Sequence, residues 1–176
     1  MGAKYLKAKQ IIAVDIQASK FPLAMELGAT DVINGRETSD VVAKIKEITG
    51  GIGADFAVQK MIGKTLNCLR RSLTILPSDA LNSTGMFGKT ATVGVTPTGS
   101  KVSIDPLQWL LYSKSYVGVR EGDSVPPEFI PKLVEMQRAG DFPVDKIVKV
   151  YDYKDFEKAL HDLHEGTVVK PVIQWS

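Results

Sequence analysis

The sequence has little of what a metal site requires: one cysteine, Cys68, and two histidines, His161 and His164, among 176 residues. A single cysteine excludes an internal disulfide framework and favours a reducing compartment. Cys68 stands among leucines at helical spacing, where packing is its expected role. The histidines stand near the end of a predicted helix, where cations are favoured at the surface. We therefore expect no zinc site, because tetrahedral zinc needs several such ligands together.

The sequence also lacks an excess of charge and a long apolar segment. Lys plus Arg is 22 and Asp plus Glu is 20, which gives a net charge of +2. This balance, without a basic cluster, argues against a nucleic-acid-binding protein. No apolar run approaches the roughly 20 residues of a membrane span, and the first ten residues show no secretory signal. We expect a soluble, cytoplasmic protein that binds neither nucleic acid nor membrane.

Apolar residues make up 44% and charged residues 24% of the chain, as in ordinary globular domains. Short apolar segments alternate with helical patterns, which is typical of parallel βαβ units. The sequence therefore predicts an α/β fold with a doubly wound, mostly parallel sheet. Strands are expected at residues 11–16, 31–34, 55–59, 89–95, 115–120 and 168–173. Helices are expected at residues 2–9, 20–27, 41–48, 65–76, 127–139 and 154–165.

Several local features refine this prediction. The continuous apolar character of residues 11–16 is typical of a strand buried on both faces. Ser19 and Ser39 are the expected N-caps of the helices that follow them, and Gly28 is the expected end of the first of these. Residues 77–88 have the composition of a structureless loop, which is long for a compact domain.

Asp15 is the most informative single residue, because it ends the first expected strand, where ligands bind in doubly wound sheets. A carboxylate there can accept both ribose hydroxyls of an adenosine and would repel a 2′-phosphate. Lys20, at the start of the next helix, could reach the same ribose. Alternatively, Asp15 merely ends a strand and Lys20 is a solvated surface charge. The spacing of these residues alone favours neither interpretation over the other.

The glycine-rich segments give weaker signals. Gly50-Gly51-Ile52-Gly53 follows a helix and precedes a strand, whereas a phosphate-binding loop follows a strand and opens a helix. These glycines are therefore expected to stop a helix and form a turn. Gly94 ends another strand, where a glycine serves either close approach of a ligand or packing.

Three segments together resemble the cofactor-binding half of the zinc-dependent medium-chain alcohol dehydrogenases. They are Ile12-Ala13-Val14-Asp15, the run of residues 27–34 (LGATDVIN) and Val93-Gly94-Val95. Residues 121–131 are similar to the aryl- or benzyl-alcohol dehydrogenase branch, and residues 166–172 resemble the family's C-terminus. The resemblance runs over nearly the whole chain and implies a Rossmann domain that binds NAD.

The resemblance also implies which residues meet each part of the cofactor. Asp15 and Lys20 match the positions that hold the adenosine ribose of NAD, and Lys170 matches a basic residue that approaches the pyrophosphate. The nicotinamide end is met by four valines: Val93 and Val95 match backbone positions near the ring, and Val117 and Val119 match the strand whose backbone meets the carboxamide.

The sequence departs from the family in two respects. The family has an upstream catalytic domain with the zinc ligands, then a first Rossmann strand with a Gly-x-Gly-x-x-Gly turn, and this sequence resembles only the C-terminal half. Residues 1–122 are thus expected to form a truncated NAD-binding domain, and residues 123–176 the segment that in the family returns to the catalytic domain. After Phe56 the family usually has an acidic residue and then Thr-Gly, whereas this chain continues with Val58-Gln59-Lys60-Met61. Residues 60–82 are interpreted as a divergent, spliced or misannotated segment.

Two classes of function remain open. The chain is either the NAD-binding portion of an alcohol dehydrogenase-like oxidoreductase, inactive by itself, or a non-catalytic module for nucleotide binding or protein association. In the family's strand order the first strand lies between residues 11–16 and 55–59. Without it two strand edges stay open, and we therefore expect a homo-oligomer.

Overall fold

The computed structural model describes residues 1–59, 77–95 and 98–175. Contacts divide the chain into two compact units. The first comprises Met1–Ala13, Gln17–Val32 and Val125–Ser176, and the second Val14–Ile16 and Ile33–Ser124. The predicted helix at residues 65–76, including Cys68, lies outside the described residues. The boundary after residue 122 between a cofactor domain and a C-terminal segment stays a prediction.

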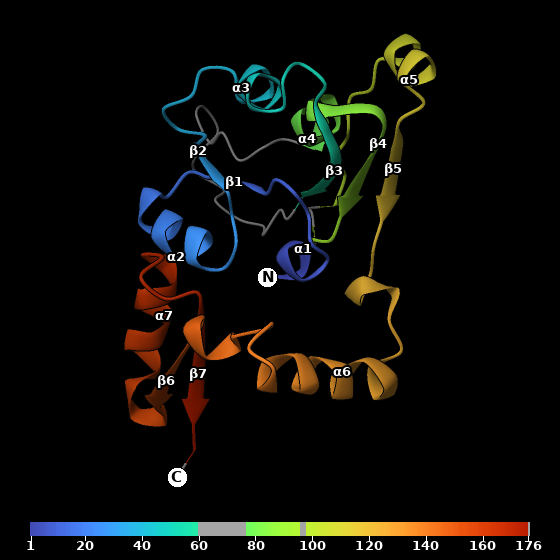
Figure 1. The fold of residues 1–176 in the computed structure, drawn as a ribbon. Coiled ribbons are helices and arrows are strands. Elements are labelled where there is room, and N and C mark those ends of the chain that lie inside the picture. Colours follow the sequence, from blue (N-terminus) through green and yellow to red (C-terminus); the bar gives the residue numbers. More distant parts are fainter. Residues whose placement is uncertain (60–76, 96–97, 176) are drawn as a thin grey trace. The chain divides into compact units, whose positions relative to one another are not determined.

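Strands and helices alternate along the chain, and the fold is α/β (Figure 1). The strands are β1 (Ile12–Asp15), β2 (Asp31–Asn34), β3 (Ala54–Gln59), β4 (Thr84–Thr92), β5 (Ser115–Gly118), β6 (Val148–Asp152) and β7 (Lys170–Gln174). The α-helices are α1 (Gly2–Tyr5), α2 (Phe21–Glu26), α3 (Val41–Ile48), α4 (Pro77–Ser83), α5 (Pro106–Tyr112), α6 (Pro126–Arg138) and α7 (Phe156–His164).

The described strands form three separate sheets, ordered β1-β2, β3-β4-β5 and β6-β7. Pairing is parallel between β3 and β4, between β4 and β5, and between β6 and β7. In the first sheet Asp31 N–H donates to the Ile11 carbonyl and Gly35 N–H to the Asp15 carbonyl. The bonded positions advance in the same direction along both chains, so β1 and β2 are parallel as well.

The second unit is built on β3, β4 and β5, which lie side by side in Figure 1. Helix α4 packs on β3, β4 and α3, and it buries Ala80 and Leu81. Asp40 caps α3, whose buried residues Val41 and Ile45 lie one turn apart. The parallel register of β3–β5 brings the carboxyl ends of these strands together at one edge.

In the first unit α7 packs against β6 and β7 (Figure 1). The buried residues Tyr151, Ala159 and Val168 form its core, with Ile173 packed against them. Asp162, on α7, accepts hydrogen bonds from the Tyr151 hydroxyl and the Lys158 ammonium, both at 2.7 Å. The hydrogen bond from Lys158, and then that from Tyr151, lowers the pKa of Asp162 to about 2.

Several sequence predictions are confirmed, and the two serine caps are wrong. Strand β2 and helix α3 have the predicted bounds. Ser19 lies inside a 3₁₀ turn, Ala18–Lys20, and α2 begins after it without a side-chain cap. Asp40, not Ser39, caps α3, because its carboxylate reaches the Ala43 N–H at 2.8 Å. All four residues of β1 are half-buried, so the strand is not covered on both faces as predicted.

The predicted loop at residues 77–88 is also wrong, because it contains α4 and the first half of β4. Strand β4 forms a bulge here: Ala54 pairs with Thr84, but Phe56 pairs with Lys89. Sequence analysis missed α5 and β6 altogether. Within the described ranges, no helix has the length and apolar character needed to cross a membrane.

The glycine-rich turn between α3 and β3 yields the first prediction. Gly53 has φ +86°, and a Cβ there would lie 2.8 Å from both Gly85 N and the Ser83 carbonyl oxygen. Gly51 also has φ +86°, with nothing within 4 Å of its Cβ position. We expect Gly51→Ala to cost about 1 kcal/mol of unfolding free energy through backbone strain. Gly53→Ala should cost about 1–3 kcal/mol more, because it adds a clash with backbone. Urea unfolding of both variants measures this, and equal losses would contradict the close packing.

The Asp162 cluster predicts how acid acts on the first unit. A folded-state pKa near 2, below the ordinary 3.8, means that the ionised carboxylate stabilises the fold above pH 4. That contribution is lost as the pH falls from about 4 towards 2. Asp162→Asn should therefore lower stability at neutral pH and flatten the loss of stability in acid. The exposed Asp141 offers a matched control, Asp141→Asn, and urea unfolding at several pH values should separate the two. Parallel acid profiles for Asp162→Asn and the wild type would contradict this role.

Candidate functional site

The carboxyl ends of β3, β4 and β5 meet at one edge of the second unit's sheet. Gln59, the last residue of β3, pairs with Thr92, the last residue of β4, and Thr92 pairs with Gly118, the last residue of β5. Parallel α/β sheets bind ligands outside this edge, because their loops and helix ends converge there. This edge is the candidate site.

A continuous set of hydrogen bonds joins the three strand ends. The Thr92 hydroxyl donates to Gln59 Oε1 at 2.8 Å. Val93 N–H donates to the Gln59 carbonyl at 3.1 Å, and Val119 N–H donates to the Thr92 carbonyl at 2.9 Å. Gln59 is 4% exposed, so its side chain is part of the interior. Gln59 and Thr92 thus hold the two backbone segments that the sequence resemblance assigned to the nicotinamide.

These bonds also decide which groups a ligand would meet. The N–H groups of Val93 and Val119 are engaged within the sheet. A ligand at this edge would therefore have to use donors other than these two N–H groups. Gln59 Nε2 is such a donor, because it is buried and has no hydrogen-bond partner in the part of the chain that the structure describes.

Two buried polar atoms are unsatisfied on this face of the sheet. Besides Gln59 Nε2, the hydroxyl of Thr90 has no partner among the described residues, and Thr90 is 0% exposed. Thr90 and Thr92 are two residues apart on β4, so their side chains point to the same face. An unsatisfied buried polar group costs about 1–3 kcal/mol. Such a cost is ordinary at a ligand site and unusual in a structural core.

The predicted site residues divide between the two units. Asp15, Val93, Val95, Val117 and Val119 belong to the second unit. Val117 pairs with Ala91 across β5 and β4, beside the strand ends that hold Val93 and Val119. Val95 lies beyond β4 and is 88% exposed. Asp15 ends β1, and its carbonyl accepts the Gly35 N–H at 3.0 Å.

The two predicted lysines belong to the first unit. Lys20 ends the 3₁₀ turn before α2, and its N–H donates to the Gln17 carbonyl. Lys170 begins β7, and its N–H donates to the Ile147 carbonyl. The structure thus brings Val93, Val117 and Val119 together at neighbouring strand ends but not Val95, and the roles of all four towards a cofactor stay predictions, as do those of Asp15, Lys20 and Lys170.

Sequence analysis missed Gln59 and Thr92 as members of this site. Each is an ordinary polar residue at the end of a strand, and no local motif marks it. Their contact spans 33 residues of sequence. Only the register between β3 and β4 places them side by side.

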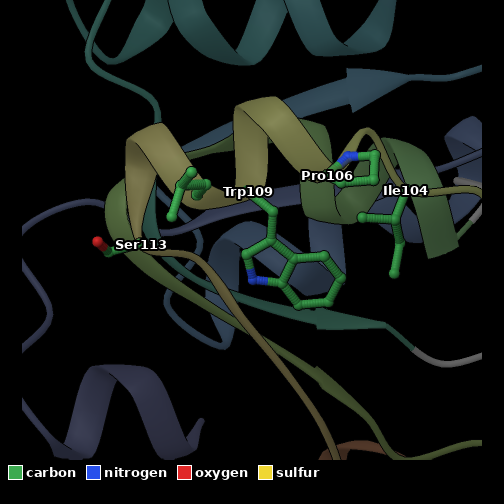
Figure 2. Close-up of a pocket in the computed structure, with 5 residues that line it drawn as sticks. Ile104, Pro106, Trp109 and Ser113 are labelled. Carbon is green, nitrogen blue, oxygen red and sulfur yellow. The ribbon is translucent and has the colours of Figure 1, made fainter.

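A shallow apolar hollow lies on the same unit, along α5 (Figure 2). Figure 2 shows Trp109 between Ser113 at one end and Pro106 with Ile104 at the other. Among the described residues that line it there is none of the predicted site residues, and Ser113 brings the hydroxyl group. The Trp109 indole N–H donates to the Lys114 carbonyl. The hollow therefore offers little for recognising a polar cofactor.

Lys114, between α5 and β5, links this part of the chain to α4. Its ammonium donates to the Leu81 carbonyl at 3.0 Å and lies 5.6 Å from the centre of the Tyr112 ring. Burial, and then the charge of Lys46, lowers the pKa of Lys114. The contact explains why β5 starts next to α4's C-terminal end.

The described residues do not fit zinc. Within them, no three His, Cys, Asp or Glu side chains cluster as a metal site requires. His161 and His164 are exposed on α7, as predicted. Cys68 lies outside the described residues, and the expectation of no zinc site stays a prediction.

Comparison with known proteins identifies the family. A family model described as "zinc-binding dehydrogenase" matches residues 1–138. The chain belongs to the zinc-binding dehydrogenase family. The resemblance drawn from the sequence is thus confirmed, and it extends to the C-terminal portion of these dehydrogenases.

Relatives of the chain include proteins named as geraniol and benzyl alcohol dehydrogenases. The chain is 30% identical to geraniol dehydrogenase of Castellaniella defragrans, over 98% of the chain and 43% of the relative. A solved benzyl alcohol dehydrogenase from Acinetobacter calcoaceticus is 37% identical, with a TM-score of 0.84, over 96% of this chain and 43% of that one. An alcohol dehydrogenase zinc-binding domain protein from Burkholderia ambifaria is 39% identical, with a TM-score of 0.82, over 95% and 42%. The chain therefore spans less than half the length of these dehydrogenases.

Proposed function

We propose that this chain is the NAD-binding portion of an alcohol dehydrogenase-like oxidoreductase. The observation that carries the proposal is the convergence of Val93, Val119 and the unsatisfied Gln59 amide at the carboxyl edge of a parallel sheet, in a member of a dehydrogenase family. In this proposal the valine backbones border the nicotinamide, Asp15 and Lys20 hold the adenosine ribose, and Lys170 approaches the pyrophosphate. When bound, NAD supplies the hydride acceptor.

The proposal includes a finer description of the fold. The strand pairs β1-β2 and β3-β4-β5 are the two halves of one doubly wound Rossmann-like sheet, and the first strand of that fold belongs between β1 and β3. Residues 1–122 form this incomplete cofactor domain, and residues 123–176 form the segment that in the family returns to the catalytic domain. Supporting it, β1 pairs with β2 alone and β3 with β4 alone in the described part of the chain.

A second candidate function is a non-catalytic module for protein association. Apolar side chains on α5 favour it: Leu107 is 62% exposed, Leu110 75% and Leu111 63%. On the open strand β3, Phe56 is 73% exposed and Val58 72%. Apolar surface at two places of one unit is typical of a chain that associates. Association and NAD binding are compatible, and the tests below address them separately.

Cofactor choice tests the proposed site directly. Asp15 should favour NAD over NADP, because a carboxylate facing a 2′-phosphate is a like-charge contact that costs several kcal/mol. Binding should be weak, since the phosphate-cradling turn of the family has no counterpart in this sequence. Calorimetry with both nucleotides, on the wild type and Asp15→Ala, measures this. Equal binding of NADP by the wild type, or unchanged NAD binding by Asp15→Ala, would contradict the role of Asp15.

The open strand edges predict a homo-oligomer. In the described part of the chain, β1 and β3 each have one edge without a neighbouring strand, and these edges, together with the exposed Phe56 and Val58, favour addition of another chain. Analytical ultracentrifugation at micromolar concentration should give a dimer or a larger assembly. Phe56→Lys and Val58→Lys should shift the distribution towards monomer, whereas the control Met25→Lys, on α2, should not. A monodisperse wild-type monomer would refute the prediction.

Catalysis provides the third test. Oxidation of an alcohol in this family needs a Lewis acid to stabilise the developing alkoxide and a cofactor held against the substrate. The described residues provide no metal-ligand cluster. We expect the isolated 176-residue chain to bind no stoichiometric zinc and to reduce no NAD with benzyl or short-chain alcohols. Turnover that co-purifies with the chain and disappears in Asp15→Ala would show this expectation to be wrong.

A further inference from the structure

The unsatisfied amide of Gln59 allows a more specific statement about the ligand, and it rests on the proposed NAD site. Gln59 Oε1 accepts the Thr92 hydroxyl at 2.8 Å, which fixes the side chain and sets the direction of its amide. Nε2 then has no partner among the described residues, although the side chain is 4% exposed and cannot rely on bulk water. A fixed, buried donor that has no acceptor among the described residues is a candidate contact for a bound ligand.

We propose that Gln59 binds the nicotinamide end of the dinucleotide, with Nε2 donating a hydrogen bond to the carboxamide oxygen. Two features of the edge support this assignment. The N–H groups of Val93 and Val119 are used within the sheet, so neither of them can donate to the carboxamide. Gln59 is also the last residue of its strand, at the place where the proposed nicotinamide position borders Val93.

A glutamine amide can donate a hydrogen bond at this position, whereas an ionised carboxylate cannot. The family usually has an acidic residue after the strand that contains Phe56, and an ionised carboxylate can only accept hydrogen bonds. Gln59→Glu therefore keeps an acceptor for the Thr92 hydroxyl and removes the donor. Gln59→Met removes both without adding charge. Thr92→Val leaves the amide in place but releases its orientation, so Thr92 acts as a positioning residue.

The test compares NAD with ADP-ribose, which has the same ribose and phosphate groups but no nicotinamide. By calorimetry, Gln59→Glu and Gln59→Met should weaken NAD binding by about fivefold to tenfold, as expected for one hydrogen bond, and leave ADP-ribose within about twofold. Thr92→Val should give a smaller loss of the same selectivity. Gln174→Glu, at the exposed end of β7, controls for the added charge, and Thr84→Val, at the opposite end of β4 from Thr92, controls for removing a buried polar atom.

Two further measurements identify the bonded atoms. The side-chain amide resonance of Gln59, assigned by its absence in Gln59→Met, should shift on adding NAD but not ADP-ribose. The 3-acetylpyridine analogue of NAD keeps the carbonyl oxygen and lacks the amide nitrogen. It should show the same loss on Gln59→Glu as NAD does, because Gln59 donates to the oxygen. A loss seen with NAD and absent with the analogue would overturn this direction of donation.

The outcomes separate this inference from the function on which it rests. If the wild type binds neither NAD nor ADP-ribose, the proposed function is wrong and the inference is wrong with it. If both bind, and the Gln59 variants weaken the two equally or not at all, the inference alone is overturned. Circular dichroism and thermal melting confirm that each variant is folded, and the uncharged Gln59→Met decides the matter if Gln59→Glu does not fold.

Discussion

Parallel pairing of β3, β4 and β5 is the constraint on which the candidate site depends. Because the strands run in the same direction, their last residues meet at one edge, and each last residue must find partners for its polar groups there. Gln59 and Thr92 meet this requirement together: backbone bonds continue the sheet to Val93 and Val119, and a side-chain bond ties two strand ends. In this arrangement Gln59 Nε2 has no hydrogen-bond partner among the described residues. A purely apolar pair at these positions would close the sheet equally well and would offer a ligand nothing.

The regular elements were predictable where one local signal determined them. Strand β2 and helix α3 have the predicted bounds because short apolar patterns there end at clear breakers. The cap of α3 was misplaced by one residue, since Ser39 and Asp40 are both good caps and only backbone geometry selects the one that reaches Ala43. Signals for α5 and β6 were present in the sequence: Asp105 precedes Pro106 as a cap and first helical residue, and β6 alternates apolar and polar residues. Helix α4 carried a weaker signal, because its seven residues are mostly polar or small and tertiary packing decides its state.

The candidate site was predictable only in part, for a reason that differs between its residues. Val93, Val117 and Val119 were placed through their likeness to a known family, and Asp15 through its position at a strand end. Gln59 has neither kind of signal. Its importance lies in its burial and in a hydrogen bond to a residue on the next strand, and both depend on the register of β3 against β4. That register includes a bulge at Gly85–Gly88, in a stretch whose composition predicts a loop. A pattern read along one strand cannot supply a relation between two strands.

Polar groups at two places in the fold have different numbers of partners, and the difference bears on function. In the first unit Asp162 is fully engaged, with Tyr151, Lys158 and Lys149 around one carboxylate. In the second, Gln59 Nε2 and the Thr90 hydroxyl lie in the interior without partners among the described residues. Satisfied polar networks rigidify a fold, whereas unsatisfied ones lower its stability until a partner arrives. A ligand that supplies the missing acceptor binds the folded state and not the unfolded one, so it stabilises this unit by mass action. In the proposed site, stability and ligand binding are therefore coupled at the carboxyl edge of β3–β5, through the same buried amide.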